Sequence, residues 1–459
     1  MRIGGRAMQG KRSRVTRRFL LQGAAGGAGM LALAACGTAT MMPEAGEAPA
    51  EEESKAEEAP QAMEPTVVSA LMVLQGQNET WINSWNTIFA NFEAANPEYT
   101  MEITDSTFGE VTTKAGAALA AGISFDDIYG YFGWLGPFVD GGIIQPVTPL
   151  LAKDTDVSPD DFYESGILKY KGVAYGLAWL LTAHPIWSNN DKFVEAGLKT
   201  PAELEAEGNW TWDAVLEAAT RLTVREGDEI TFGGLRIYPT HTSYLPYYAW
   251  AWGADLWNEG CTQATFNTPE FADAVQFCVD LFAKHKVIGG NFLEGTLGMF
   301  ERATGGVRQF EERITANDLF EIGMAGRPKG PNGDSATVMT PIGIFIGEGA
   351  KNPEGGWAFL KYTVSADALP EVAATGQGRF TANKHLEPLT LFPYEDPEVY
   401  KRMAAEGRPV PQLLKQGDFN TEWRATWDAM VEGSLTVAEG MAKTQEQVQG
   451  WINEGGCLR

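Results

Sequence analysis

The chain has 459 residues, and its 60 Asp and Glu against 35 Lys and Arg give a formal net charge of −25 at pH 7. A surface of this charge repels the nucleic-acid backbone, so the composition argues against a nucleic-acid partner. The length exceeds what one ordinary hydrophobic core fills, so we expect two domains.

The first 35 residues have the pattern of a secretory signal peptide. They carry seven Arg or Lys and no acidic residue, and the apolar stretch after Arg18 is short and rich in glycine. A basic start, a short apolar run and small residues before a cleavage point are typical of an export signal rather than a membrane span. The segment TRRFLL, Thr16–Leu21, resembles the twin-arginine export signal, and the general secretory route stays open.

Cys36 closes the tetrapeptide Leu33-Ala34-Ala35-Cys36, which is similar to the bacterial lipobox. This similarity implies that Cys36 becomes the mature N-terminus and carries lipid that anchors the protein to the outer face of the cell membrane. Stable anchoring takes two or more acyl chains. Residues 36–65 hold eight Glu and four Pro and no aromatic residue. We expect a disordered acidic tether there, because so polar a segment cannot bury enough apolar surface to fold.

From residue 66 onward, expected strands alternate with expected helices. The run TVVSALMVL at 66–74 indicates a buried strand, and the helix after it carries Trp81 and Trp85 on one face and ends at Asn96-Pro97. Further expected elements are a strand at 100–104, a short helix at 112–122, a strand at 126–132 and a short helix with a turn at 136–147. This alternation predicts an α/β fold with a largely parallel sheet.

The second half of the chain gives further element signals. Thr211 and Thr268 are expected helix N-caps, the latter followed by Pro269 at the first helical position. The run YYAWAWGADLW at 247–257 indicates a strand-like segment with Trp250 and Trp252 on one face. These elements are expected to form scaffold around a second core.

The cysteines are few. Cys278 shares an apolar helical face with Phe271, which predicts a buried thiol. Besides Cys36 and Cys278 the chain has Cys261 and Cys457. The odd number of cysteines after the anchor argues against a disulfide framework, and a Cys261–Cys457 bridge stays open.

Six segments follow one another in a recognisable order and spacing. They are DDIYGYF at 126–132, WLGPFVDGGIIQPVTPLL at 134–151, GVAYGLAWLLTAHPIWSNNDKFVEAGL at 172–198, NWTWDAVLEAATRLT at 209–223, FNTPEFADAVQFCVDL at 266–281 and GEGAKNPEGGWAFLKYTVS at 347–365. Together they resemble the family 1 extracellular solute-binding proteins, the sugar-binding lipoproteins of ABC importers. The resemblance covers the chain from about residue 66 to its end. Two departures from the family pattern are Ala178, where the family usually has proline, and Ser188-Asn189-Asn190, where it has Tyr-Asn-Lys.

The resemblance implies a two-lobed α/β fold of the periplasmic-binding-protein type, with a hinge and a ligand cleft between the lobes. Lobe one is expected at 66–180 and 340–382, and lobe two at 181–339 and 383–459. The resemblance further implies a monomeric binding protein, not an enzyme. Such a protein needs no cofactor or metal, and it delivers a mono- or oligosaccharide to the permease subunits of an ABC transporter.

The candidate ligand-binding residues lie at expected strand ends and loops. Aromatic rings there offer flat surfaces to the C–H faces of sugars, and carboxylates and amides can bind their hydroxyls. The residues are Gln75, Asn78 and Glu79 after the first strand, Tyr131 and Trp134 after the third, Trp179 and His184 at the expected hinge, Trp250 and Trp252, and Arg379 in a late loop. Which of Trp250 and Trp252 faces the cleft stays open.

Other interpretations compete with these. His184 is expected more often to be structural, Asp127 to be a hydrogen-bonding strand end, and Arg379 to pair with a surface carboxylate. A secreted glycosidase stays an alternative, since an aromatic cleft with two carboxylates also describes such enzymes. A polyamine or peptide binder is a second alternative. The tryptophans expected in the core are Trp81, Trp85, Trp212 and Trp357.

Overall fold

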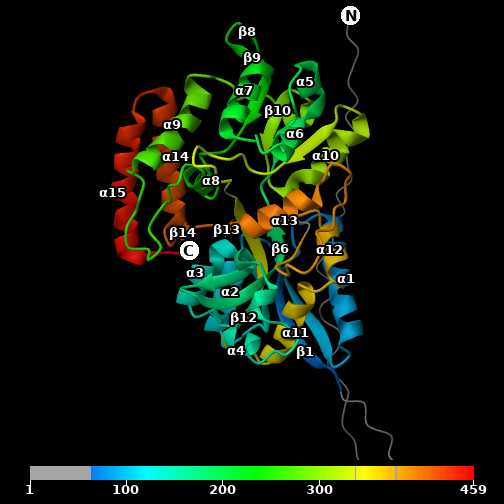
Figure 1. The fold of residues 1–459 in the computed structure, drawn as a ribbon. Helices are drawn as coiled ribbons and strands as arrows, with labels where there is room; N and C mark the ends of the chain where they lie inside the picture. The colour runs from blue at the N-terminus through cyan, green and yellow to red at the C-terminus, as the bar shows by residue number, and fades with distance from the viewer. Residues whose placement is uncertain (1–63, 336, 378–379, 459) are drawn as a thin grey trace, which may run out of the picture. The chain divides into compact units, whose positions relative to one another are not determined.

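The computed structural model describes residues 64–335, 337–377 and 380–458. The described residues belong to one compact unit that spans Ala62–Arg459 (Figure 1). The expected signal peptide, Cys36 and nearly all of the expected tether lie outside the described residues. No helix in the described part of the chain is long and apolar enough to cross a membrane.

The first sheet has eight strands, in the order β2-β1-β3-β12-β6-β5, with β4 and β13 paired to β12. The strands β1, β2 and β3 run parallel, whereas β12 is antiparallel to both β3 and β6. Its strands are β1 Thr66–Val73, β2 Tyr99–Ser106, β3 Asp127–Tyr131, β4 Ile144–Gln145, β5 Ile167–Tyr170, β6 Val173–Thr182, β12 Val338–Gly347 and β13 Arg408–Pro409.

The second sheet has five strands, in the order β11-β7-β10-β9-β8. Only β9 and β10 run parallel in it. Its strands are β7 Ile186–Asn189, β8 Val224–Glu226, β9 Glu229–Arg236, β10 Leu297–Glu301 and β11 Ile322–Ala325. A separate hairpin pairs β14 Gln412–Leu413 with β15 Cys457–Leu458.

The expectation of a largely parallel sheet is therefore wrong, because both sheets are mixed. The chain leaves the first sheet at the end of β6, builds the second sheet, and then returns as β12 between β3 and β6. Because β12 enters the first sheet at the edge where β3 and β6 end, it runs antiparallel to both of them. No local pattern in residues 338–347 encodes this direction.

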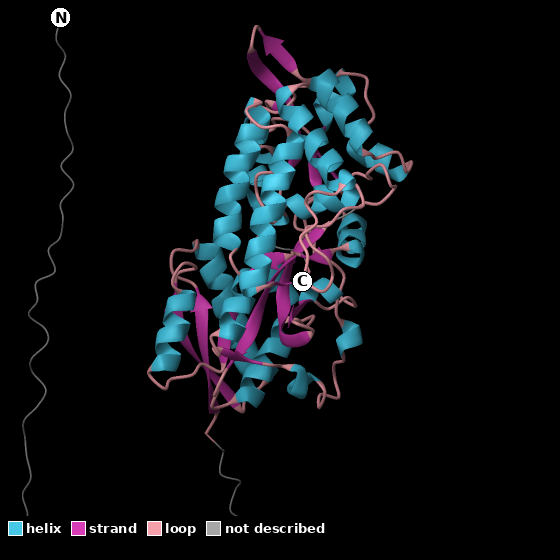
Figure 2. Cartoon of the chain, turned by 90° about the vertical axis from the view of Figure 1, so that its left-hand side faces the viewer, coloured by secondary structure: helices cyan, strands magenta, loops and turns pink. Residues whose placement is uncertain are grey.

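Helices pack against both sheets (Figure 1, Figure 2). They are α1 Glu79–Ala95, α2 Val111–Ala120, α3 Leu135–Asp140, α4 Thr148–Leu151, α5 Asn190–Glu195, α6 Pro201–Ala206, α7 Trp212–Leu222, α8 Leu245–Ala251, α9 Pro269–Ala283, α10 Val307–Arg313, α11 Pro353–Thr363, α12 Leu369–Ala374, α13 Pro397–Glu406, α14 Gln416–Glu432 and α15 Val437–Gly455.

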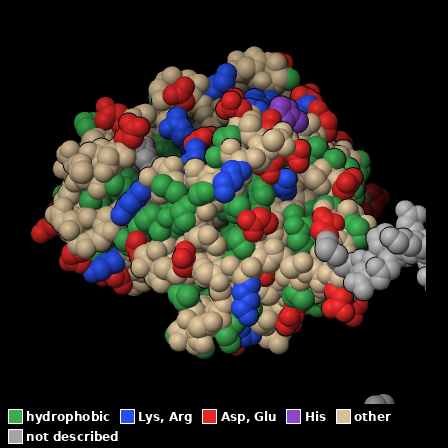
Figure 3. Space-filling model, turned by 90° about the horizontal axis from the view of Figure 1, so that it is seen from below, with side chains coloured by type: hydrophobic (Ala, Val, Ile, Leu, Met, Phe, Trp, Pro, Cys, Tyr) green, Lys and Arg blue, Asp and Glu red, His purple; other side chains and the backbone are tan. Residues whose placement is uncertain are grey.

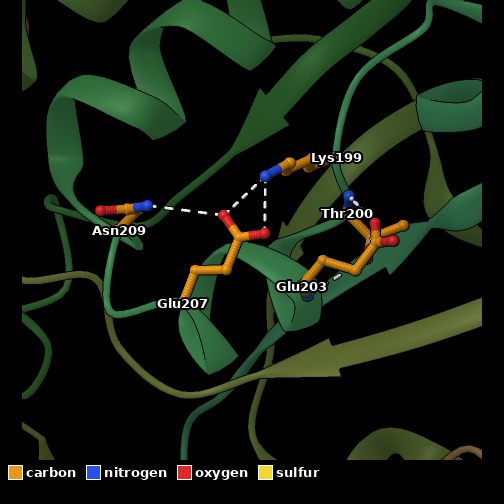
Figure 4. Close-up of polar contacts among 5 residues, drawn as sticks. All are labelled: Lys199, Thr200, Glu203, Glu207 and Asn209. Atoms are coloured by element: carbon orange, nitrogen blue, oxygen red, sulfur yellow. Dashed lines mark hydrogen bonds and ion pairs between the residues drawn. The ribbon is translucent and has the colours of Figure 1, made fainter.

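The expected helix starts are confirmed. Thr211 and Thr268 accept hydrogen bonds from backbone N–H groups in the first turns of α7 and α9, as N-caps do. A capping box adds the same kind of support to α6, where the Thr200 N–H donates to Glu203 Oε2 at 2.7 Å and Glu203 N–H donates back to Thr200 Oγ1. Figure 4 shows this box beside the exposed Lys199–Glu207 ion pair.

The segment expected to be strand-like at 247–257 begins instead as the helix α8, Leu245–Ala251, with Pro246 in its first turn. All seven residues of α8 are buried, so the run shows neither an alternating nor a helical pattern of exposure. The preference of aromatic residues for strands depends on their surroundings, and in this segment tertiary packing overrides it.

Cys261 and Cys457 form a disulfide that joins the loop after α8 to the C-terminal hairpin, with a sequence separation of 196 residues. The structure thus settles a pairing that the cysteine count left open. Cys278 is a buried free thiol within α9, as expected.

Charged side chains are spread over the surface. On the face drawn in Figure 3, Asp and Glu are interspersed with Lys, Arg and apolar side chains rather than gathered in one patch.

Candidate functional site

The ends of strands from both sheets meet where the chain passes from β6 to β7. Because β3 and β6 are both antiparallel to β12, they end at the same edge of the first sheet, at Tyr131 and Thr182. In the second sheet β10 ends at Glu301, which pairs with Ile186 at the start of β7. The crossing segment at 182–186 therefore brings the two edges together, and ligands of α/β sheets bind at such edges.

A pocket of about 540 Å³ opens at this crossing. It draws residues from the end of β6, the loop between β9 and α8, the segment after β10, the loop after α12, and α14. The lining residues are Thr182, Tyr238, Thr240, His241, Tyr244, Glu301, Arg302, Ala303, Gly305, Gly306, Gln377 and Arg424. We call this space the crossing pocket.

Exposed and half-buried aromatic rings lie after β2 and β3. Phe108, which is 42% exposed, packs against Tyr131 and Trp134 with ring centroids 5.2 and 4.6 Å apart. Burial raises the pKa of Tyr131 to about 12. Burial, the Glu301 carboxylate and then Tyr131 raise the pKa of Tyr244, which lines the crossing pocket, so Tyr131 lies close to this pocket.

His184, a predicted site residue, lies on the crossing segment itself but is only 2% exposed. Its Nε2 lies 3.4 Å from Thr340 Oγ1, and its ring meets the Tyr244 ring edge-on at 4.8 Å. Burial and the nearby Arg327 guanidinium lower its pKa to about 3, so the imidazole is neutral at physiological pH. His184 supports the wall of the crossing pocket from behind.

A buried ion pair also lies behind the crossing pocket. Glu301 Oε2 accepts a hydrogen bond of 2.5 Å from Tyr248 and lies 3.2 Å from Arg327 Nη1. The Arg327 guanidinium carbon in turn stands 4.2 Å from the centre of the Tyr247 ring. Burial raises the pKa of Glu301, while Arg327 and Tyr248 act against this shift.

Trp179 does not line any surface of this structure. It is 0% exposed, and its ring packs edge-on against Trp85 and Trp81 at 4.8 and 5.8 Å. It belongs to the core of the first sheet, because β6 lies between β12 and β5 and both rings that pack on Trp179 come from α1. Trp81, Trp85, Trp212 and Trp357 are buried as expected.

Gln75, Asn78 and Glu79 are exposed in the connection from β1 to α1. Asn78 Oδ1 accepts a hydrogen bond from the Trp81 N–H, so this side chain is engaged as the N-cap of α1. The Gln75 N–H donates to Asp105 Oδ1 at 2.8 Å. None of these three side chains lines the crossing pocket.

Trp250 and Trp252, in and after α8, pack against other side chains of the protein. Trp250 is 4% exposed, with the Arg408 guanidinium 5.0 Å from its ring centre. Trp252 is half-buried and packs on Phe277 at 5.1 Å. Neither lines the crossing pocket. Arg379 lies outside the described residues.

Asp127 was expected to form hydrogen bonds at the strand end, but its neighbour Asp126 forms them instead. Asp126 Oδ2 accepts from the Ser69 N–H and hydroxyl, and Oδ1 accepts from the Asn352 N–H. Both carboxylate oxygens of Asp127 are buried without a hydrogen-bond partner in the described part of the chain. Burial, and to a lesser degree Asp126, raises the pKa of Asp127 well above 3.8.

A larger pocket of about 720 Å³ lies beside the disulfide, lined by Phe132, Leu168, Pro341 and Cys457 among others. It sits against the edge strand β5 and the C-terminal hairpin. The crossing pocket is the better candidate, because the carboxyl ends of strands from both sheets border it. No group of three or more His, Cys, Asp or Glu in the described residues is placed to hold a metal ion.

Sequence reasoning missed most of the crossing pocket. Arg302, Gly305 and Gly306 follow β10, whose strand pattern LGMFE would have placed them at a carboxyl end. Gln377 and Arg424 carry no such signal, since only the tertiary fold brings the loop after α12 and the helix α14 to this place.

Comparison with known proteins identifies the family. A model of the bacterial extracellular solute-binding protein family matches residues 78–369. The chain belongs to this family. The family consists of binding proteins rather than enzymes, which confirms that part of the prediction, and its members act outside the cytoplasm. A Brucella abortus strain 2308 protein named "Putative binding protein" is 25% identical over 313 residues, which are 65% of this chain and 70% of that protein.

Several solved structures of binding proteins share the fold. The sugar-binding protein MalE of Xanthomonas citri aligns with a TM-score of 0.70 and 16% identity, over 85% of this chain and 98% of its own. The cyclic alpha-maltosyl-1,6-maltose binding protein of Arthrobacter globiformis gives 0.68 and 20%, over 85% and 100%. Lmo0181 of Listeria monocytogenes, solved with cycloalternan, gives 0.67 and 18%, over 85% and 99%. The two-lobed fold is thereby confirmed.

Proposed function

We propose that this family member is a carbohydrate-binding protein that captures a mono- or oligosaccharide at the crossing pocket and delivers it to the permease of an ABC transporter. The observation that carries the proposal is the convergence of strand ends from both sheets on the crossing segment, beside aromatic rings. Tyr238 and Tyr244 line the pocket, and Tyr131 lies next to it. Such rings offer flat faces to sugar C–H groups.

The polar lining suits hydroxyl groups. Thr240, Gln377 and Arg302 supply both donors and acceptors around the same space. The three structural relatives described above carry names or ligands that are saccharides. These likenesses agree with a carbohydrate solute.

The alternatives fit this pocket less well. A polyamine would place ammonium groups beside two arginines, Arg302 and Arg424, which like charge disfavours. A glycosidase needs two carboxyl groups that flank the substrate, and among the described lining residues Glu301 is the only one with a carboxylate.

The proposal extends to the N-terminal region. We propose that Cys36 carries the lipid anchor and that residues 36–65 hold the binding unit away from the membrane. For a flexible chain of this length the expected span is about 30 Å. Such a tether would leave the crossing pocket free to meet solute and permease.

A thermal-shift panel of neutral oligosaccharides, acidic oligosaccharides, polyamines and short peptides tests the function. A ligand at about 100 times its Kd should stabilise the protein by about 2.7 kcal/mol. We expect stabilisation by saccharides alone, and the saccharide should be recovered unchanged after prolonged incubation. Stabilisation by polyamines or peptides only, or hydrolysis of the sugar, would refute the proposal.

A further inference from the structure

The crossing pocket carries positive charge that the protein does not compensate. Among the described residues of its lining, Glu301, Arg302, Arg424 and His241 have side chains that can be charged near neutral pH. The charge of Glu301 is balanced within the protein, because Arg327 Nη1 lies 3.2 Å from its carboxylate and both side chains are buried. Glu301 therefore brings no net negative charge to the pocket.

The remaining acid–base group of the lining is neutral. Partial desolvation and the nearby Arg424 guanidinium lower the pKa of His241. The ring stacks on Tyr244 with centroids 4.7 Å apart. At physiological pH this imidazole therefore adds hydrogen-bonding capacity to the pocket and no charge.

Arg302 and Arg424 remain, and in the described part of the chain neither guanidinium has an ion-pair or hydrogen-bond partner. This is unexpected in a chain with 60 acidic residues, where most surface cations could find a carboxylate. Arg302 is also held in place: its guanidinium lies 5.8 Å from the Phe300 ring centre, and a Cβ at Gly306 would collide with its Nε.

We propose that the solute of the crossing pocket is an anionic saccharide, one that carries a carboxylate or a phosphate, and that Arg302 and Arg424 bind this group. The inference rests on the proposed carbohydrate function and narrows it. Guanidinium groups present paired N–H donors that match the oxygens of either anion. Gln377 and Thr240 remain for the hydroxyls, and Tyr238 for the sugar face.

The acidic surface does not oppose this assignment. Exposed charges more than about 10 Å apart are largely screened at about 0.1 M salt, so the distant carboxylates act mainly on the association rate. Among the described residues that line the pocket, the two guanidiniums are the charges that no other group of the protein balances. Local contacts therefore determine the sign of the preferred ligand.

Calorimetric titration with matched probes tests the inference. The probes are trigalacturonate and its carboxyl-reduced trisaccharide, and glucose 1-phosphate and glucose. We expect at least one anionic probe to bind about tenfold or more tightly than its neutral counterpart, with affinity that falls as salt is raised. The pair that shows the preference identifies the anion as carboxylate or phosphate.

Substitutions assign the preference to the two arginines. Arg302→Gln and Arg424→Gln should each weaken binding of the preferred anionic probe about 10- to 100-fold and reduce the preference for it over the neutral sugar. Gly306→Ala should act like Arg302→Gln, because it displaces that guanidinium. Arg313→Gln is the control: Arg313 is exposed on α10 outside the pocket lining, and its loss changes the net charge equally.

The outcomes separate this inference from the proposed function. If neutral saccharides bind as tightly as anionic ones and the arginine variants change nothing, the anionic assignment is wrong and the carbohydrate function stands. If no saccharide binds at all, both are wrong.

Discussion

Exposure decides what two tryptophans of this protein can do. Trp134 is half-buried in the ring group with Phe108 and Tyr131, whereas Trp179 is fully enclosed by Trp81 and Trp85. Trp134→Ala should weaken saccharide binding about 10- to 100-fold with little effect on the unliganded melting temperature. Titration calorimetry measures this change directly.

Trp179→Ala is the matched comparison. It should lower the free energy of unfolding by about 3–5 kcal/mol, because it opens a cavity in the core, and leave the affinity of the folded protein near normal. Chemical denaturation measures the loss. If Trp179→Ala abolished binding in a protein of normal stability, our placement of this residue in the core would be wrong.

The raised pKa of the buried Asp127 carboxyl predicts that the stability of the protein depends on pH. Its pKa in the folded protein is raised well above 3.8 by burial, so the folded state holds a proton that the unfolded state loses as pH rises above about 3.8. The stabilising effect of this proton is therefore present at low pH and is lost as pH rises towards the folded pKa.

Asp127→Asn removes that titration. We expect the variant to be more stable than wild type at neutral pH, with a difference that shrinks as the pH approaches the ordinary pKa of aspartate. Melting temperatures across acidic and neutral pH provide the test. A variant less stable than wild type throughout that range would contradict the raised pKa.

At the level of single residues, Tyr131 and His184 lie beside the crossing pocket. Local pattern and family resemblance could place these two residues at strand ends, and their contact with a ligand stays a prediction. The placement of Trp179 in the cleft is wrong, because the strand β6 is buried on both faces at this residue and a resemblance in sequence does not report burial. Arg302 and Arg424 were missed since their proximity is a property of the tertiary fold.

Among the elements, the disulfide between Cys261 and Cys457 has a measurable role. It closes a loop of 196 residues, so in the chain-entropy view it restricts the unfolded state strongly. Replacing both cysteines with serine should lower the free energy of unfolding by about 2–5 kcal/mol. The measurement is the free energy of unfolding with and without a reductant. The reductant should lower this free energy for wild type by about 2–5 kcal/mol, as the double substitution does, and should leave it unchanged for the variant.

Element by element, the sequence predicted what local chemistry determines. Residue patterns predict the strand β1 and the helix α1 with its end at Asn96. They also predict the N-caps Thr211 and Thr268. The direction of β12 and the helical state of α8 did not follow, because strand order and complete burial are set by the whole chain.

For the whole molecule, the anchor can be tested apart from binding. Under the proposed role of Cys36, Cys36→Ala should release the protein from the membrane fraction and leave saccharide affinity unchanged, because Cys36 is not among the residues that line the crossing pocket. Cell fractionation with lipid labelling measures release. Full membrane retention of the variant, with lipid still attached, would show that Cys36 is not the anchor.

The central claim is that a saccharide binds where the two sheets meet. The most direct test is a crystal structure of the protein with the saccharide that stabilises it most. We predict a sugar in the crossing pocket, in contact with Tyr244 and Arg302 of the second sheet region and close to Tyr131 at the end of β3. A sugar bound instead beside the Cys261–Cys457 disulfide, or contacts confined to one sheet, would contradict the account.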